Sequence, residues 1–488
     1  MKLAKALLKF GCPTHAAMAL LHDAANILKV QVSFVTLPNT IIASFGNCEE
    51  MTSEIEMLSG GGGLDLGRLP MVRVVYYNVV HDIISAKDAI DCLDQLMDGK
   101  PIHGKLTKCF FAFMLSALIC VMSFGGSFVD MWIAGLGSAT FSAVRLFVIP
   151  KVHMGYASAY EISMTIAISF VSRGLSSIRS EVFCYNAISS AGIVSILPGF
   201  LILTSSLELA SKNILCGAAK MIYVLVFVLF ITFGLQLGSD LYLLLDRGAR
   251  HKFAEVAATY LNPVLYVGSF VSDSMKLDGT PIYVGTFQFQ SPAIQPKDML
   301  VGCHRPADFP WYKQPFAWWS LFFLVPLYTL LSSMANMQPV FKRTRQQKRY
   351  AGADGKWQTT TVERWTLSAD LVVMVMIAIL SYTCNKIAKM YIFNQSDVVA
   401  AIGAFTVGVM GNTYQRLAGG TAFTYMVTGV CFLVPSSFSQ TGDNFSGDII
   451  DIGTAMIRIS VGISVGLLMA RFIVCTFGKQ MRSGSLTF

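Results

Sequence analysis

The chain has 488 residues, of which 54% are hydrophobic and 14% charged, and its mean hydropathy is +0.56. Soluble globular domains carry about 25% charged residues, so this composition excludes an ordinary soluble protein and indicates a polytopic membrane protein. The net charge of +8 does not indicate nucleic-acid binding, because the basic residues stand in short loops between apolar segments, where membrane orientation accounts for them.

Residues 1–105 differ from the rest and predict a small cytosolic α+β domain. Residues 14–28 have helical periodicity, whereas VQVSFVT and TIIASF, separated by a turn at Pro38, predict a β-hairpin, and EIEMLS predicts a third strand. The stretch VRVVYYNVVHDII fits a helix or a strand, and its periodicity does not decide between them. Ser85 followed by Asp88 predicts the start of a helix over SAKDAIDCLDQLMDG.

Apolar segments then recur to the end of the chain, and ten of them predict transmembrane helices. A helix needs about 20 apolar residues to cross a bilayer, and several segments, notably the eighth, are short for that. They define a first transmembrane half at 106–240, an extracytosolic loop at 241–315, and a second half with a short cytosolic tail at 316–488. The ten segments are 108–127, 130–149, 156–173, 186–207, 218–240, 316–337, 366–386, 397–413, 419–437 and 453–475.

Basic residues assign the loops to the two sides of the membrane. The loop 341–365 has seven Lys or Arg against two acids and is expected in the cytosol, whereas 435–452 has three Asp and no base and is expected outside. The bases at 173 and 179, and those at 386 and 389, disagree with this assignment. The balance predicts both termini in the cytosol, in the plasma membrane or an internal membrane. Cys184 and Cys303 would share the outer side, which is compatible with a disulfide.

Spacing within the two halves suggests an internal repeat. Pro198 follows Asp130 by 68 residues, and Pro435 follows Asp370 by 65. Such a repeat pairs spans one to five with spans six to ten, and an odd number of spans turns the second copy upside down. The predicted fold class is therefore a polytopic α-helical membrane protein with about ten spans in two five-helix inverted repeats, preceded by the small soluble domain.

Ordered motifs along nearly the whole chain resemble the threonine/serine exporter family, and in particular its fungal branch, the pheromone-regulated membrane proteins. No single motif is specific, but their number and order are. They are GCPTH (11–15), LPNTIIASFG (37–46), TSE (52–54), GLDLGRL (63–69), VVHDIIS (79–85), FGGSFVD (124–130), EIS (161–163), LPGF with SLELASKN (197–213), AIGAFTVGVMGNTYQRLAGG (401–420) and VPSS (434–437).

The resemblance implies a secondary transporter that exports small hydroxy amino acids from the cytosol, driven in the bacterial members by a proton gradient. The partners would be a small amino acid, protons and membrane lipid, with no nucleic acid and no cofactor. The family usually follows the Pro-Thr-His motif with an Arg and a Glu, whereas Ala16 and Met18 stand here. Any function of that charged pair is missing from this chain.

The proline-glycine pair in LPGF is the first candidate for a substrate pathway. Pro198 removes a helix hydrogen bond and Gly199 loosens the backbone, so the pair predicts a broken helix, and Pro435 with Ser436 predicts a second break. The alternative is a plain kink that neighbouring helices accommodate. Asn412, near a span end, and Tyr223 complete the predicted pathway.

Three carboxylates near or within the apolar runs are candidates for proton coupling or gating. Glu208 is a pathway carboxylate at the cytosolic mouth or a helix-end residue paired with Lys212. Glu161 stands about one turn inside its span, and Asp130 begins one, where an acid also suits the helix dipole.

Enzyme motifs are missing from the sequence. His15, His81 and Asp82 are hydrolase-like residue types, but there is no GxSxG, HExxH or GxxxxGK[ST] motif and no Cys/His metal spacing. Two alternatives to a transporter stay open: a membrane scaffold in cell contact or fusion, and a membrane enzyme acting through the N-terminal domain. A GxxxG pattern at Gly462 and Gly466 predicts close helix packing and is compatible with a homodimer.

Overall fold

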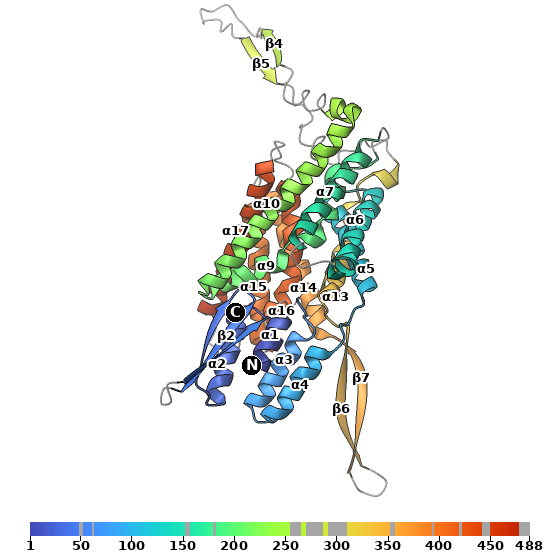
Figure 1. Ribbon diagram of the computed structural model, residues 1–488. Coiled ribbons are helices and arrows are strands. Elements are labelled where there is room, and N and C mark those ends of the chain that lie inside the picture. The colour runs from blue at the N-terminus through green and yellow to red at the C-terminus, as the bar shows by residue number, and fades with distance from the viewer. Residues whose placement is uncertain are drawn as a thin grey trace, which may run out of the picture.

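A small α+β domain sits at one end of a long helical bundle in the computed structural model (Figure 1). The structure describes residues 1–47, 52–60, 63–151, 157–178, 182–253, 265–269, 286–290, 310–351, 357–392, 395–418, 422–441 and 449–477.

The N-terminal domain combines four helices with a three-stranded antiparallel sheet in the order β1-β2-β3. The predicted hairpin and third strand are confirmed, with Val32 opposite Phe45 and Ile41 opposite Leu58. The stretch whose periodicity was ambiguous is helical. The elements are α1 (Lys2–Lys9), α2 (Thr14–Ile27), β1 (Val32–Leu37), β2 (Thr40–Asn47), β3 (Thr52–Ser59), α3 (Leu69–Val80) and α4 (Ala86–Asp98).

Local sequence explains two of these elements. Asn39 takes a positive φ of 61°, which Asn tolerates better than most residues, and so closes the β1–β2 turn after Pro38. Ser85 accepts a hydrogen bond from the Asp88 amide at 3.2 Å and caps α4 as predicted.

The bundle contains a helix at each predicted apolar segment, and one of the segments is divided. The helices are α5 (Lys105–Phe124), α6 (Phe128–Phe147), α7 (Ala157–Ser176), α8 (Tyr185–Gly192), α9 (Gly199–Ala210), α10 (Ile214–Leu245), α13 (Leu321–Ala335), α14 (Ala369–Tyr391), α15 (Ser396–Ala418), α16 (Ala422–Thr441) and α17 (Ile449–Phe477).

Among the described residues, six helices are long and apolar enough to cross a membrane, or seven if the bent pair of α8 and α9 counts as one span. The prediction of ten spans is therefore not confirmed. Helix α7 is not among these helices because Glu161, Arg173 and several serines lower its mean hydropathy. The apolar part of α16, Ala422–Ser437, is too short to cross a membrane.

The inverted repeat also stays a prediction, although the two halves share one packing device. In α10, Gly234 and Gly238 let the helix approach α7, and a Cβ at Gly238 would collide with the Ile166 carbonyl. In α17, Gly462 and Gly466 do the same against α15. The GxxxG pattern of α17 is thus used inside the chain rather than displayed for a dimer.

Two hairpins mark the opposite ends of the bundle in Figure 1. The basic hairpin β6–β7 (Phe341–Ala351 and Trp357–Leu367) extends at the end that holds the N-terminal domain, and β4–β5 (Leu265–Ser269 and Thr286–Gln290) extends at the other. The two hairpins therefore lie at opposite ends of the bundle, and which end faces the cytosol stays a prediction. Cys184 is disulfide-bonded, and its predicted partner, Cys303, lies outside the described residues.

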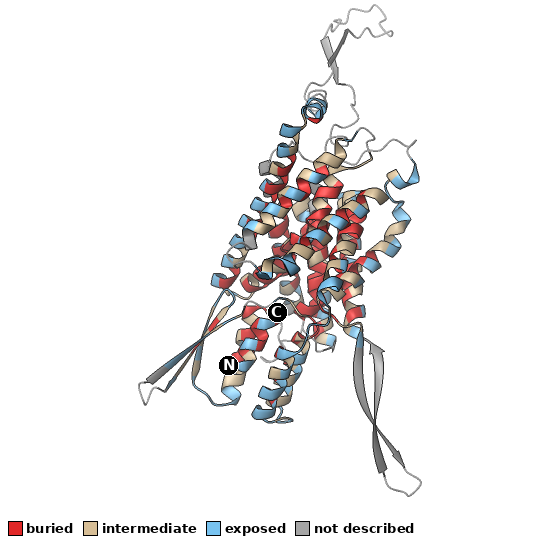
Figure 2. Ribbon diagram, turned by 45° about the vertical axis from the view of Figure 1, so that its right-hand side comes forward, coloured by how far each residue is buried: buried red, intermediate tan, exposed pale blue. Residues whose placement is uncertain are grey.

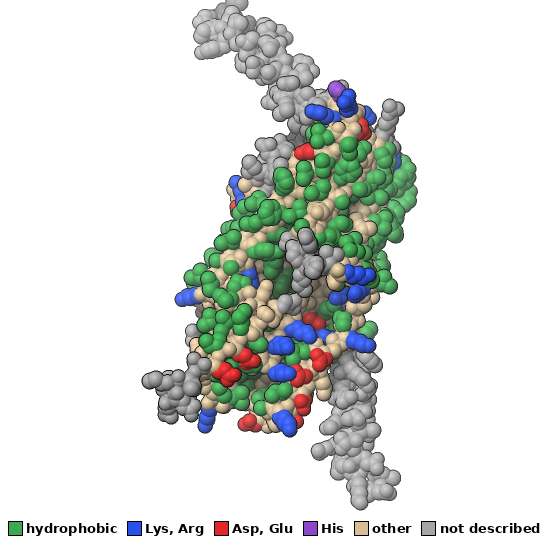
Figure 3. All heavy atoms as spheres, viewed as in Figure 1, with side chains coloured by type: hydrophobic (Ala, Val, Ile, Leu, Met, Phe, Trp, Pro, Cys, Tyr) green, Lys and Arg blue, Asp and Glu red, His purple; other side chains and the backbone are tan. Residues whose placement is uncertain are grey.

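A single apolar core joins the N-terminal domain to the bundle (Figure 2). Leu7 and Leu20 of the domain belong to the same cluster as Leu207 of α9 and Val427 of α16. Figure 3 shows hydrophobic side chains over the outside of the helices, whereas acidic and basic side chains gather on the N-terminal domain. The domain is therefore packed onto the bundle and not merely tethered to it.

Candidate functional site

A break in the fourth apolar segment begins the site. Helix α8 ends at Gly192, a short 3-10 turn covers Val194–Ile196, and α9 starts at Gly199, bent by 56° from the preceding helix. Pro198 has no N–H to continue the helix. The predicted interruption at Pro198 and Gly199 is present.

Gly199 lies directly against α16. A Cβ at this position would stand 3.3 Å from Cα of Cys431 and 3.6 Å from the side chain of Val434. Only glycine allows the start of α9 to come this close to another backbone without displacement.

The second predicted interruption is wrong. Helix α16 continues through Pro435, and Ser436 donates its hydroxyl to the Leu433 carbonyl at 3.0 Å. A proline inside a helix removes one hydrogen bond, here the one to the carbonyl of Cys431, and packed neighbours can accommodate that loss. The two proline regions still meet, because Gly199 touches α16 one turn before Pro435.

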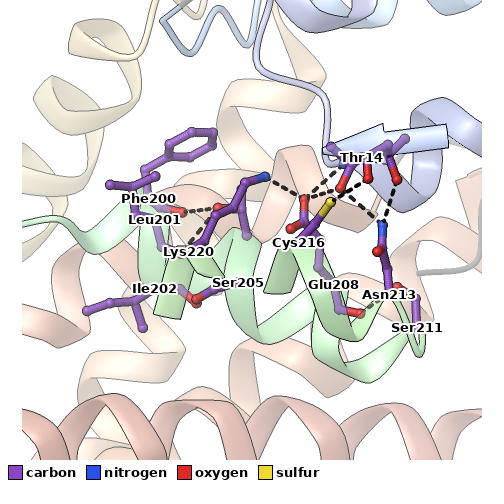
Figure 4. A network of polar contacts seen from close by, with 12 residues as sticks. Thr14, Phe200, Leu201, Ile202, Ser205, Glu208, Ser211, Asn213, Cys216 and Lys220 are labelled. Carbon is purple, nitrogen blue, oxygen red and sulfur yellow. Dashed lines mark hydrogen bonds and ion pairs between the residues drawn. The ribbon is translucent and has the colours of Figure 1, made fainter. Parts of the chain in front are cut away.

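Glu208, on the last turns of α9, is fully buried and joins three elements (Figure 4). Its Oε1 accepts hydrogen bonds from the Thr14 amide at 3.0 Å and the Thr14 hydroxyl at 2.5 Å. The ammonium of Lys220, on α10, donates to the same oxygen at 2.6 Å. Since Thr14 is the first residue of α2, a carboxylate from the bundle neutralises the N-terminus of an N-terminal-domain helix.

The pairing of Glu208 with Lys212, one alternative drawn from the sequence, is wrong. Lys212 takes a positive φ of 65° in the turn that follows α9. The turn folds α10 back against α9, and this brings Lys220, twelve residues along the chain, beside the carboxylate. Spacing along one helix could not reveal a partner that a helical hairpin supplies.

The second carboxylate oxygen of Glu208 differs from the first in its hydrogen bonding. Among the described residues, Oε2 is buried and has no hydrogen-bond partner. A buried acceptor without a donor costs about 1–3 kcal/mol, and more for a charged group. Protonation or a ligand donor would relieve that cost, so Glu208 has the chemistry of a proton or cation acceptor.

Further contacts tie the N-terminal domain to the α9–α10 hairpin. Asn213 donates to the hydroxyls of Thr14 and Thr36 at 3.4 Å each, and the Cys216 thiol donates to the Thr36 carbonyl at 3.4 Å. From α17, Arg471 donates to the Ala210 carbonyl at 2.7 Å and caps the end of α9. The end of α9 is therefore held from several sides.

A cavity of 40 Å³ lies next to this contact, between the N-terminal domain and helices α9 and α16. Cys12, His15 and Arg73 bring polar groups to its wall. Burial lowers the pKa of His15 to about 4, against an opposing effect of Glu208, so the imidazole is neutral near pH 7. Burial, followed by the charge of Glu208, raises the pKa of the Cys12 thiol to about 12.

Asp130 and Glu161 lie outside this network. Asp130 forms a capping box with Ser127 and also accepts from the Cys184 amide at 3.0 Å, so its carboxylate performs structural work. The Glu161 carboxylate makes no hydrogen bond among the described residues and is half-buried on α7. Their participation in proton coupling stays a prediction.

Two predicted pathway residues are also placed apart from the break. Asn412 is buried on α15 and donates to the Gly408 carbonyl of its own helix at 2.8 Å. Tyr223 is 51% exposed on α10 and stacks on Phe227, so the structure does not bring it into the site. His81 and Asp82 are exposed at the end of α3, and the described residues contain no cluster of His, Cys, Asp or Glu that could hold a metal.

Sequence reasoning missed the functions of Thr14, Arg73, Lys220 and Arg471. Two of these residues carried a usable signal, because Lys220 and Arg471 stand inside apolar runs, where a charge is costly without a partner. Thr14 belongs to the Pro-Thr-His motif, but nothing in that motif indicates a contact with residue 208.

The region that carries this network matches a known family. Residues 1–242 match the family described as "Putative threonine/serine exporter". These residues make up just under half of the chain, so the similarity to this family concerns the N-terminal domain and the first helices through most of α10. The matched exporter region contains Thr14, Glu208 and Lys220 and ends within α10, whereas α16 and α17 lie beyond it.

Three relatives match this chain over its full length. An uncharacterized protein of Schizosaccharomyces pombe is 28% identical over 513 residues, which cover 100% of this chain and 56% of that protein. Pheromone-regulated membrane protein 10 of Pichia sorbitophila is 28% identical, covering 100% and 43%, and that of Kluyveromyces lactis is 26% identical, covering 100% and 44%. The chain thus spans about half the length of these relatives. No solved structure matches it.

Proposed function

We propose that the chain is a secondary transporter that exports small polar amino acids of the threonine or serine type, coupled to protons. The observation that carries the proposal is Glu208, a buried carboxylate with one unsatisfied oxygen that stands between a broken helix and the N-terminal domain. The similarity of the region that holds this residue to a family described as putative threonine/serine exporters supports the same function.

The broken helix offers a site for a zwitterion. The N–H of Gly199 is bonded to the Leu197 carbonyl at 2.9 Å, but the next residues of the first turn of α9 direct backbone N–H groups towards the preceding break, and such groups favour a carboxylate. Glu208 follows about nine residues later, or roughly 13 Å along a helix at 1.5 Å per residue. We therefore assign Glu208 to proton coupling and gating rather than to contact with a substrate at Gly199.

The gate in this proposal is the N-terminal domain. Protonation of Glu208 weakens its bonds to Thr14 and Lys220, which favour the ionised carboxylate. The domain then lifts from the α9–α10 hairpin and opens the end of the bundle. A carboxylate that both holds the domain and takes the proton couples the two events.

Two other functions fit the site less well. A membrane scaffold needs neither a broken helix nor a buried charge network, and Ala16 and Met18 in place of a charged pair are the feature in its favour. An enzyme acting through the N-terminal domain needs an activated nucleophile beside a base. His81 and Asp82 are exposed and do not line the cavity. The Cys12 thiol, which shares the cavity wall with His15, stays protonated near pH 7 because burial raises its pKa to about 12.

The test is efflux of labelled serine and threonine from proteoliposomes with and without an imposed pH gradient. Glu208→Gln is expected to reduce gradient-driven efflux at least tenfold while substrate binding persists. Glu56→Gln is the matched control, since its carboxylate is exposed on β3 and lies outside the network. Absence of efflux from the unmodified protein overturns the exporter, and normal gradient-driven efflux by Glu208→Gln overturns the coupling function.

A further inference from the structure

We propose that the cavity between the N-terminal domain and the bundle binds the carboxylate group of a small organic acid, with Arg73 as the charge that holds it. The inference rests on the proposed function for one detail, that an α-amino acid is the ligand in the cell. It adds a site distinct from the broken helix, located where the N-terminal domain meets α9 and α16.

The volume of the cavity limits the size of the ligand that it can bind. Its 40 Å³ is the volume open to the centre of a water-sized sphere, and one water needs about 10–15 Å³ by that measure. The space therefore holds about three waters, or one carboxylate group with its three heavy atoms. The remaining atoms of an amino acid, serine included, fit only if the N-terminal domain moves outward. Binding of the ligand and movement of the domain are therefore linked.

The walls supply one cation in apolar surroundings. Arg73 reaches the cavity from α3, whereas Leu7, Leu20, Leu69 and Phe423 surround it with hydrocarbon. An arginine donates two parallel hydrogen bonds to a carboxylate, and the exclusion of water strengthens that attraction. Burial lowers the pKa of Arg73, which shows that its charge is partly removed from water.

An anion lies on the other side of the same wall. The Cys12 thiol, which lines the cavity, lies near the charges of Glu208, Arg73 and Lys220. Lys220 occupies only one of the two oxygens of Glu208. Leu207 and Pro13 also line the cavity, and each is the chain neighbour of a residue in the Glu208–Thr14 contact. A ligand with a carboxylate and an ammonium matches this order of charges better than a simple acid does.

Ala16 supplies the small side chain that keeps the space open. It lines the cavity from the first turn of α2 and is buried. A longer side chain at this position fills the cavity, whereas Ala19, on the same helix, is exposed. Ala16→Leu and Ala19→Leu are therefore a matched pair that differ in whether the substitution occupies the site.

The experiment measures equilibrium binding by the full chain in detergent, with L-serine, acetate and ethanolamine as separate probes. Serine and acetate share the carboxylate, and ethanolamine has only the amine. We expect serine to bind at least tenfold more tightly than acetate, and ethanolamine not to bind. Arg73→Gln should lower serine affinity at least tenfold, Arg73→Lys should restore part of it, and Ala16→Leu should abolish it while Ala19→Leu does not.

The outcomes separate this site from the proposed function. Equal serine binding by the unmodified protein and Arg73→Gln overturns the site, even if efflux is observed. Binding of ethanolamine as tight as that of serine also overturns it. Carboxylate binding that depends on Arg73, with no efflux from proteoliposomes, retains the site and overturns the exporter. Each variant is also examined by size-exclusion chromatography. A variant that elutes as one monodisperse species has not lost binding through misfolding.

Discussion

Two proline-containing segments, one in each half of the bundle, have opposite outcomes. At Pro198 the helix stops, turns by 56° and restarts as α9, whereas α16 runs through Pro435 without a break. The segment that breaks has glycine after its proline, and the one that continues has serines, of which Ser436 bonds back to its own helix. At these two positions the break accompanies a glycine after the proline, and the continuous helix accompanies a serine that bonds back to its own turn.

The same comparison distinguishes the half of the bundle that contains the candidate site from the half against which that site packs. The broken segment leads to Glu208 and to the N-terminal domain, and the family match covers this half. The continuous helix α16 serves as the surface against which Gly199 packs. Changes at the two proline segments are therefore expected to have very different effects.

The largest expected difference is between Gly199→Leu and Pro435→Ala. A leucine at Gly199 must displace the backbone of α16 at Cys431, so efflux and substrate binding should both be lost. Pro435→Ala restores a helix hydrogen bond in a helix that is already continuous, and efflux should stay within about twofold of the unmodified protein. Efflux by the two variants is measured in parallel. Greater loss of efflux in Pro435→Ala than in Gly199→Leu would show that the second half contains the segment that moves.

A smaller effect is expected from Thr14. Thr14→Val keeps the shape of the side chain but removes the hydroxyl that donates to Glu208. A hydrogen bond to a charged group contributes about 1.5–3 kcal/mol, so the N-terminal domain should detach at least tenfold more often. The rate at which maleimide reaches the largely enclosed Cys12 at fixed pH measures this, with Thr14→Ser as the control. Equal rates in all three proteins would contradict a holding function for the contact.

The smallest effect concerns pH. The pKa of His15 is about 4 in the docked state, and an exposed histidine has a pKa of about 6.5, so the undocked state takes up a proton first as pH falls. Docking is therefore strongest above pH 6.5 and weakens as pH falls towards 4. Between pH 7 and pH 6 the expected change is about threefold.

Hydrogen exchange of α2, corrected for the intrinsic effect of pH, is the measurement for this titration. His15→Gln should remove the slope, provided that the charges facing His15, those of Glu208, Lys220 and Arg471, stay in place. A slope that survives in His15→Gln would contradict the assignment of the titration to His15.

Much of the N-terminal domain followed from sequence, because its signals are local. Strand alternation, the turn at Pro38 and the cap at Ser85 all act within a few residues. The helical break at Pro198 was predictable for the same reason. Periodicity left 71–83 undecided, and α3 took up most of it as a helix because tertiary packing buries Leu69 and Val72.

The site itself depends on contacts that sequence does not display. Thr14 and Glu208 are separated by 194 positions, and their contact exists only because the domain docks on the α9–α10 hairpin. The cavity wall at Arg73 and Ala16 likewise combines α3 with α2. Apolar runs indicated where helices lie, but not which of them neighbour one another.

The central claim is that the N-terminal domain must move on the α9–α10 hairpin for export to occur. Thr36→Cys places a thiol beside Cys216, whose sulfur already lies 3.4 Å from the Thr36 carbonyl. Serine efflux from proteoliposomes should proceed in the reduced protein, stop when oxidation forms the cross-link, and return after reduction, with Thr36→Ser unaffected throughout. Undiminished efflux from the fully cross-linked protein would contradict the account.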